Sequence, residues 1–171
     1  NVFKFDRTAY PAVKQAFGHV RILERHIKNT KPIRYAALLH SLDTKFMNLP
    51  DHSRDERKFF EGFYRTMLEN HIPFTVITEK DILDGNISGY KTLILPNIYC
   101  MSDTVAGKIT DYVKKGGGLV ATYLTSLADE KGNRRQDMAL GQVLGIKLKG
   151  TITRGQKGDK EPVTYYKMKQ R

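Results

Sequence analysis

The chain has 171 residues, of which 40% are apolar and 27% are charged. This length and composition fit one globular domain and exclude an intrinsically disordered chain. No apolar run approaches the roughly 18 residues of a membrane-spanning helix, and no signal-peptide pattern is present. The formal net charge is +11, and the charge excess lies mostly toward the two ends, without the interleaved aromatics of a nucleic-acid-binding surface. We therefore expect neither nucleic acid nor a membrane as partner.

The single cysteine and the start of the chain set two further expectations. Cys100 stands alone, which rules out an internal disulfide and a thiolate metal site. The histidines are scattered without metal-ligand spacing, so we expect no metal and no cofactor. Because the chain begins at Asn1 rather than Met, we expect a piece of a longer soluble protein, cytoplasmic or exported.

The first predicted element is a helix over residues 8–28. Its apolar residues recur at intervals of three and four, which places them on one stripe: Val13, Phe17, Val20, Leu23 and Ile27. Pro11 suits the first turn of a helix, and the segment 29–32, which contains Pro32, ends it.

Four short apolar runs follow, and each predicts a strand that is covered on both faces, as in a parallel sheet. They span residues 33–40, 72–78, 90–95 and 119–123. One helix is predicted over 55–70 and another over 103–115. The second begins at the N-cap Ser102 and ends at three glycines, 116–118. The first should turn five apolar residues inward: Phe59, Phe60, Phe63, Met67 and Leu68.

The connections are predicted to be mostly irregular. Residues 41–54 and 124–136 have the polar composition of loops, and residues 84–86 that of a turn. The last part of the chain is predicted to form a helix over 136–144 ended by Gly145, a strand over 146–152, a mobile segment over 153–162 and an edge strand over 163–168.

Strands and helices thus alternate, which predicts an α/β fold with right-handed crossovers. The expected architecture has three layers, α/β/α, around a doubly wound and mainly parallel sheet of flavodoxin-like strand order 2-1-3-4.

Ligands of such sheets bind beyond the carboxyl ends of the strands. Seven residues with polar or reactive side chains follow strand ends and form the candidate ligand crevice: Ser41, Asp43, Asn97, Tyr99, Cys100, Thr122 and Thr125. No glycine-rich turn follows the first strand, so the crevice lacks the usual backbone cradle for phosphate.

Two catalytic interpretations are possible at this edge. Cys100 precedes a helix start, where its thiol could become nucleophilic with His40 as a base, but a small semi-buried apolar residue explains it as well. The adjacent acids Asp129 and Glu130 could suggest glycosidase chemistry, although neighbouring acids in a basic loop are more typical of a solvated turn.

Five stretches together resemble a known family, the trimerisation domain of family 42 β-galactosidases and related barrel glycosidases. They are 35–41 (YAALLHS), 63–74 (FYRTMLENHIPF), 90–103 (YKTLILPNIYCMSD), 113–123 (VKKGGGLVATY) and 129–130 (DE). The resemblance implies a class I glutamine amidotransferase-like fold and a non-catalytic domain through which subunits associate, as a trimer. It also implies three parts: a linker helix in 1–32 from an upstream catalytic barrel, the domain in 33–150, and a basic tail or further element in 151–171.

Glutaminases with this fold place a nucleophilic cysteine directly after the fourth strand, within a Gly-x-Cys-x-Gly pattern. The corresponding residues here, 121–125, read ATYLT, so glutaminase chemistry is not expected and this fragment is not expected to be an enzyme. Three hypotheses follow: an accessory oligomerisation domain of a glycoside hydrolase whose partners are its own barrel and further copies, a sugar-binding module using the crevice, and a cysteine-dependent enzyme using Cys100.

Overall fold

The computed structural model describes residues 9–47, 56–149 and 167–168, and its contacts divide the chain into two units, 1–32 and 33–171. In the first unit, helix α1 (Tyr10–Ile27) confirms the predicted helix, with Pro11 in its first turn. None of the residues of α1 is buried. The exposed fraction of its apolar side chains reaches 69% at Phe17.

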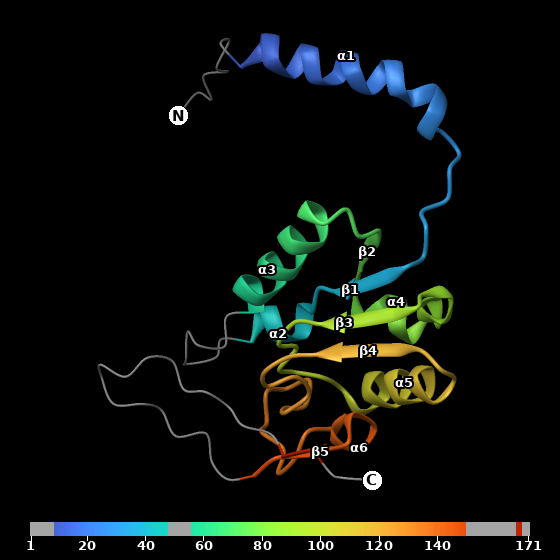
Figure 1. Ribbon diagram of the computed structural model, residues 1–171. Helices are drawn as coiled ribbons and strands as arrows, with labels where there is room; N and C mark the ends of the chain where they lie inside the picture. The colour runs from blue at the N-terminus through green and yellow to red at the C-terminus, as the bar shows by residue number, and fades with distance from the viewer. Residues whose placement is uncertain (1–8, 48–55, 150–166, 169–171) are drawn as a thin grey trace, which may run out of the picture. The chain divides into compact units, whose positions relative to one another are not determined.

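The second unit is built on a four-stranded parallel sheet (Figure 1). Its strands are β1 (Ala36–Leu39), β2 (Phe74–Ile77), β3 (Thr92–Leu95) and β4 (Gly118–Ala121). They lie in the order β2-β1-β3-β4, which confirms the predicted order 2-1-3-4. All four strands are shorter than the apolar runs that predicted them.

Helices cover both faces of the sheet. As a result, alternate residues of β1 belong to two separate hydrophobic cores. Ala36 and Leu38 pack with Met67 of α3 (Glu56–Glu69). On the opposite face, Ala37 and Leu39 belong to a cluster that includes residues of α4 (Glu79–Leu83) and α5 (Asp103–Lys114). The expected α/β/α layering is therefore present in this unit.

Two short helices occupy segments in which the sequence predicted no helix. In α2 (Leu42–Phe46), the hydroxyl of Ser41 accepts a hydrogen bond from the Thr44 amide at 3.0 Å and caps the helix. In α4, the Asp81 carboxylate accepts hydrogen bonds from the amide of Thr78 at 2.9 Å and from its hydroxyl at 3.1 Å. In both places a polar side chain fixes the first turn of a helix that is too short to show an apolar period.

Two further expectations for the helices need correction. Leu68 of α3 is 53% exposed rather than inward, because the helix turns Met67, which is 3% exposed, toward the sheet. The helix predicted over 136–144 is reduced to α6 (Gly141–Leu144), followed by Gly145 in the left-handed conformation at φ +68°. The Asp137 carboxylate instead accepts hydrogen bonds from the Met138 and Leu148 amides, which competes with helix formation.

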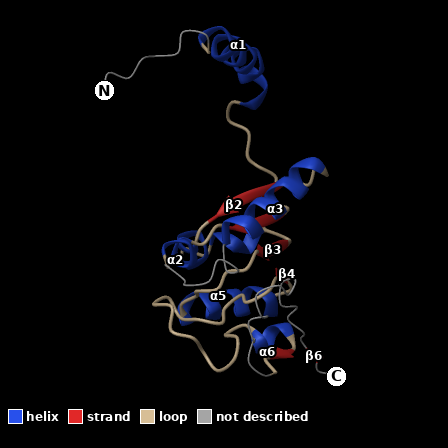
Figure 2. Cartoon of the chain, turned by 90° about the vertical axis from the view of Figure 1, so that its left-hand side faces the viewer, coloured by secondary structure: helices blue, strands red, loops and turns tan. Residues whose placement is uncertain are grey.

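The loop after β4 is present, but its first part is buried, although the composition predicted a polar loop over 124–136. Figure 2 draws it as a tan loop, and its residues 124–128 are all buried. Beyond it, β5 (Ile146–Lys147) pairs antiparallel with β6 (Lys167–Met168). These strands lie within two predicted strands, whereas the segment predicted to be mobile, 153–162, lies outside the described residues.

No helix in the described ranges combines the length and apolar character needed to cross a bilayer.

A close contact beneath α5 gives a test of this packing. A Cβ atom added to Gly117 would lie 2.2 Å from Cζ of the Tyr112 ring, whose hydroxyl donates a hydrogen bond to the Tyr90 carbonyl at 3.0 Å. We expect Gly117→Ala to lower the free energy of unfolding by about 1–3 kcal/mol, because the ring must move. Gly107→Ala in the middle of α5 meets nothing within 4 Å and should raise it by about 0.5–1 kcal/mol. Urea denaturation of both variants measures the difference; equal effects would contradict the contact.

Candidate functional site

The residues of the candidate crevice gather at the carboxyl edge of the sheet, and most of them face inward. Asp43 and Thr122 are half-buried. The other five are buried: Ser41, Asn97, Tyr99, Cys100 and Thr125. What these side chains contact decides how much of their chemistry faces solvent.

Asn97 connects the loops that follow β3 and β4. Its amide donates to the Thr122 hydroxyl at 3.1 Å, and its side-chain oxygen Oδ1 accepts from the Leu124 amide at 3.2 Å. Asn97 adopts φ +51°, a left-handed conformation that asparagine tolerates better than most residues. Its Nδ2 atom is buried without a hydrogen-bond partner among the described residues.

Thr125 adds a second connection between the same loops. Its hydroxyl accepts from the Ile98 amide at 3.2 Å and lies 2.7 Å from the Thr122 carbonyl and 3.2 Å from the Leu95 carbonyl. Buried backbone groups need partners of this kind. The hydroxyls of Thr122 and Thr125 therefore hold the fold together rather than pointing into an open site.

A third connection joins α2 to the loop after β3. The Thr44 hydroxyl accepts from the Cys100 amide at 3.1 Å and lies 3.0 Å from the Ser41 hydroxyl. Thr44 is buried, and it was not among the candidate residues selected from the sequence. The spacing of Ser41 three residues before Thr44, at the start of a short helix, was the signal that could have identified it.

The Cys100 thiol lies inside a core cluster and not at a reactive surface. The residue has no exposed area and packs with Tyr99, Leu124 and Ala128. His40, the base considered for it, contacts the Phe60 ring edge-on at a centroid distance of 4.8 Å. A cysteine in these surroundings acts as a small apolar residue, and a substrate could reach its sulfur only if the loops opened.

Tyr123 lies in the turn after β4, at the centre of residues 121–125, which lack the Gly-x-Cys-x-Gly pattern of glutaminases. It adopts φ +52°, which is uncommon for an aromatic residue, directly beyond the end of β4. Its ring stacks on Phe59 of α3, with centroids 5.6 Å apart and an interplanar angle of 13°. A sharp turn at this point is the geometry that exposes a nucleophile in many hydrolases, but here it carries a phenol packed on another ring.

The carboxyl of Asp43, at this edge, has a raised pKa. Burial raises the pKa of its carboxyl, and the neighbouring carboxylates Glu79 and Glu130 raise it further. Glu79 Oε2 also accepts a hydrogen bond from the Leu42 amide at 3.3 Å. Three acids thus lie near one another, although no group of three or more His, Cys, Asp or Glu residues with metal-binding geometry occurs among the described residues.

The adjacent acids Asp129 and Glu130 form a turn and do not face each other across a cleft. The Asp129 carboxylate accepts hydrogen bonds from the Asn133 side chain and from the Asn133 and Lys131 amides, and these bonds lower its pKa. This arrangement matches the solvated-turn interpretation.

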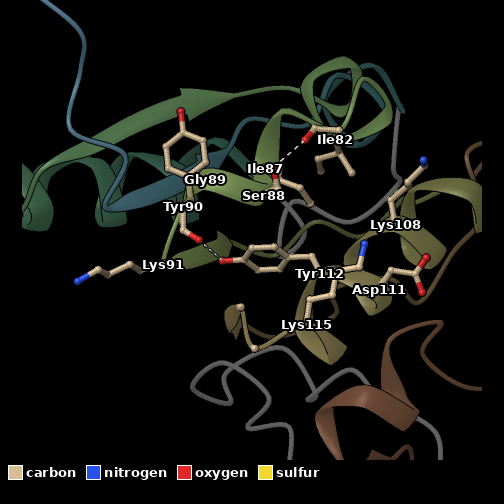
Figure 3. A pocket seen from close by; sticks show the side chains of 13 residues that line it. Ile82, Ile87, Ser88, Gly89, Tyr90, Lys91, Lys108, Asp111, Tyr112 and Lys115 are labelled. Carbon is tan, nitrogen blue, oxygen red and sulfur yellow. Dashed lines mark hydrogen bonds between the residues drawn. The ribbon is translucent and has the colours of Figure 1, made fainter.

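A surface hollow, which the sequence did not predict, lies at the opposite edge of the sheet, near the amino ends of its strands. It has a volume of about 720 Å³ and lies between α5, α4 and the 3-10 helix η2 (Asn86–Gly89) (Figure 3). The Tyr112 ring forms part of its wall, and burial raises the pKa of that phenol. Three lysines line the hollow together with a single acid, Asp111: Lys91, Lys108 and Lys115.

Comparison with known proteins places this geometry in a family. The family model described as "Beta-galactosidase trimerisation domain" matches residues 35–170. The curated β-galactosidase GanA of Bacillus subtilis is 36% identical over 67 residues, which cover 39% of this chain and 9% of that protein. LacA of Lactobacillus acidophilus, also a β-galactosidase, is 31% identical over 71 residues, covering 42% and 10%. The chain therefore spans only about a tenth of the length of these relatives.

Solved structures of whole β-galactosidases share the fold. A catalytic mutant of Gan42B from G. stearothermophilus superimposes with a TM-score of 0.69 at 20% identity, over 96% of this chain and 25% of that one. The enzyme from Bacillus circulans sp. alkalophilus gives a TM-score of 0.69 at 16% identity, over 92% and 24%. At these identities the likeness concerns the fold alone.

The link between α2 and Cys100 can be tested by an isosteric change. Thr44→Val removes the hydroxyl oxygen that accepts the hydrogen bond of the buried Cys100 amide. We expect the free energy of unfolding to fall by about 1–3 kcal/mol. Thr104→Val, at an exposed position of α5, is the matched control and should change it little. Chemical denaturation of both variants distinguishes a hydrogen bond that stabilises the fold from one that does not.

The raised pKa of Asp43 predicts a stability change that depends on pH. The folded state binds this proton more tightly than the unfolded chain, so ionisation of Asp43 as the pH rises lowers the free energy of unfolding. We expect Asp43→Asn to raise the melting temperature at pH 7. Below the ordinary value of 3.8 the gain should disappear, because the carboxyl is then protonated in both states. A thermal scan that shows the same gain at pH 3 and pH 7 would contradict this account.

Proposed function

The chain belongs to the β-galactosidase trimerisation domain family, and from that membership we propose that it is a non-catalytic accessory domain through which copies of a glycoside hydrolase associate. The main observation behind this proposal is that the family model spans most of the chain, from residue 35 to residue 170. The carboxyl edge of the sheet supports the proposal, because its polar side chains are used in hydrogen bonds that connect loops. Such an edge offers surface rather than reactive groups.

The proposal includes the finer fold assignment, a flavodoxin-like sheet of the class I glutamine amidotransferase type. Two observations support it: the strand order β2-β1-β3-β4 and the sharp turn at Tyr123 after β4. In this assignment the chain keeps the backbone turn that follows the fourth strand in glutaminases, while Tyr123 stands in place of the nucleophilic cysteine. The buried side chain of Cys100 is in keeping with a domain that does no chemistry of its own.

Helix α1 is proposed to connect this domain to an upstream catalytic barrel. Its apolar stripe supports the proposal, because side chains such as Val13, Phe17 and Val20 are about half exposed within the chain. An apolar helical face of this length ordinarily packs against another surface. The β-galactosidase activity itself, with its catalytic carboxylates, is then assigned to the part of the parent protein outside this chain.

The association of copies is directly measurable. We expect light scattering of the chain at micromolar concentration to give the mass of a trimer, and the same measurement on the parent enzyme to give three subunits. A strictly monomeric parent enzyme would contradict the proposed role. Removal of residues 1–32 should leave the remaining unit folded, since no residue of α1 is buried; circular dichroism of that shortened chain is the control.

A further inference from the structure

Helix α1 carries an apolar stripe along one face. Its residues recur at intervals of three and four, so they share that face of the helix, and each is between 48% and 69% exposed: Val13, Phe17, Val20, Leu23 and Ile27. We name these five residues the α1 stripe. An amphipathic helix is stabilised chiefly by packing of its apolar face, so the α1 stripe needs a surface to cover it.

The sheet face that packs on α3 is covered only in its middle. Four residues in register form a row across this face, one from each strand: Val76, Leu38, Ile94 and Val120. The two central residues, Leu38 and Ile94, pack with Met67 of α3 and are at most 8% exposed. Val76 and Val120, on the edge strands, are 42% and 41% exposed. Parallel sheets are normally covered on both faces, so a single helix leaves this layer incomplete.

At the β2 edge the exposed apolar surface continues from the strand onto α3. The Tyr64 ring meets the Phe74 ring of β2 edge-on, with centroids 5.2 Å apart, so this side of α3 lies beside β2. Leu68 follows Tyr64 by one helical turn and therefore shares that side. We name four residues of this surface, each between 38% and 53% exposed, the β2 flank: Tyr64, Leu68, Ile72 and Val76.

The opposite side of α3 is less open. Phe59 stacks on Tyr123 there, with centroids 5.6 Å apart, and both residues are half-buried. Contiguous apolar surface of the kind that marks an interaction site is therefore found at the β2 flank.

The α1 stripe and the β2 flank match in length and in chemistry. At a rise of 1.5 Å per residue the stripe extends about 21 Å, from Val13 to Ile27, and α3 with its 14 residues is also about 21 Å long. Two helices of this length can pack side by side along their whole extent, with axes about 8–10 Å apart. A helix in this position would complete the layer that α3 begins and would cover the β2 edge.

We propose that the α1 stripe of one copy packs on the β2 flank of the next copy, head to tail around a ring of three. The inference rests on the proposed function, because it takes the partner to be a second copy of this chain. Each contact in a closed three-membered ring is heterologous, so one surface of a subunit meets a different surface of its neighbour. The stripe and the flank are two such surfaces, and in a ring of three every stripe meets a flank.

One charge placed in either surface tests the contact. We expect Phe17→Asp in the stripe and Leu68→Asp in the flank each to weaken self-association at least about tenfold in sedimentation velocity, because a carboxylate would be buried without a partner. Two exposed residues outside the contact give matched controls. Ile22→Asp lies on the opposite face of α1, where Ile22 is 63% exposed, and Leu83→Asp lies on α4, beyond the other face of the sheet. Both should associate as the wild type does.

Mixing the two variants shows whether the contact joins different copies. The Phe17→Asp chain keeps an intact flank, and the Leu68→Asp chain keeps an intact stripe. We expect each variant alone to be monomeric and the equimolar mixture to form a one-to-one dimer, because a single good contact can form between them. A stripe that packs within its own copy, or a contact between two like surfaces, gives no dimer on mixing and overturns the inference.

The remaining outcomes separate this inference from the proposed function. An oligomer that survives both substitutions, or that weakens equally in the controls, overturns the inference and leaves the proposed function standing. A wild-type chain that is monomeric also overturns the inference, and the mass of the parent enzyme then decides the proposed function by itself. Circular dichroism shows whether a variant is folded, and an unfolded variant is replaced by Phe17→Ala or Leu68→Ala, for which the same weakening and the same result on mixing are expected.

Discussion

The hydroxyl of Thr125 and the side chain of Asn97 close the carboxyl edge of the sheet, and the rest of the domain's character follows from that closure. They join the loops after β3 and β4 through hydrogen bonds with four backbone groups: the amides of Ile98 and Leu124 and the carbonyls of Leu95 and Thr122. Parallel sheets usually leave this edge open as a binding crevice. Here the hydroxyls of Thr122 and Thr125, which could contact a ligand, are used in contacts within the protein.

Two other contacts explain the places of Cys100 and Tyr123. Cys100 is enclosed because Thr44 of α2 binds its amide while the loop after β4 packs over its side chain. Tyr123 keeps a backbone conformation that few aromatic residues adopt, and its stacking on Phe59 offers a compensating contact. A sharp turn after a strand is therefore not by itself evidence of catalysis, since the residue at its tip and the access to it decide the chemistry.

The two edges of the sheet differ in charge because the carboxyl ends are followed by Asp43 and Glu79, whereas the amino end of β4 is preceded by Lys115 at the end of α5. Lysines near the end of α5 also interact favourably with the helix dipole.

The sequence by itself determined the alternation of strands and helices, the strand order, the cap at Ser102 and the stop at the three glycines, because apolar periodicity and capping are properties of neighbouring residues. The resemblance to a family also came from the sequence alone. Only the tertiary structure decided that Thr122 and Thr125 bind backbone groups, that residues 124–128 are buried despite their place in a polar segment, and that α2 and α4 exist. It also placed a lysine-lined hollow at the edge of the sheet opposite to the expected crevice. These features depend on contacts between residues far apart in the chain, such as Asn97 with Leu124 or Thr44 with Cys100, and no local pattern encodes which partner a buried polar group will meet.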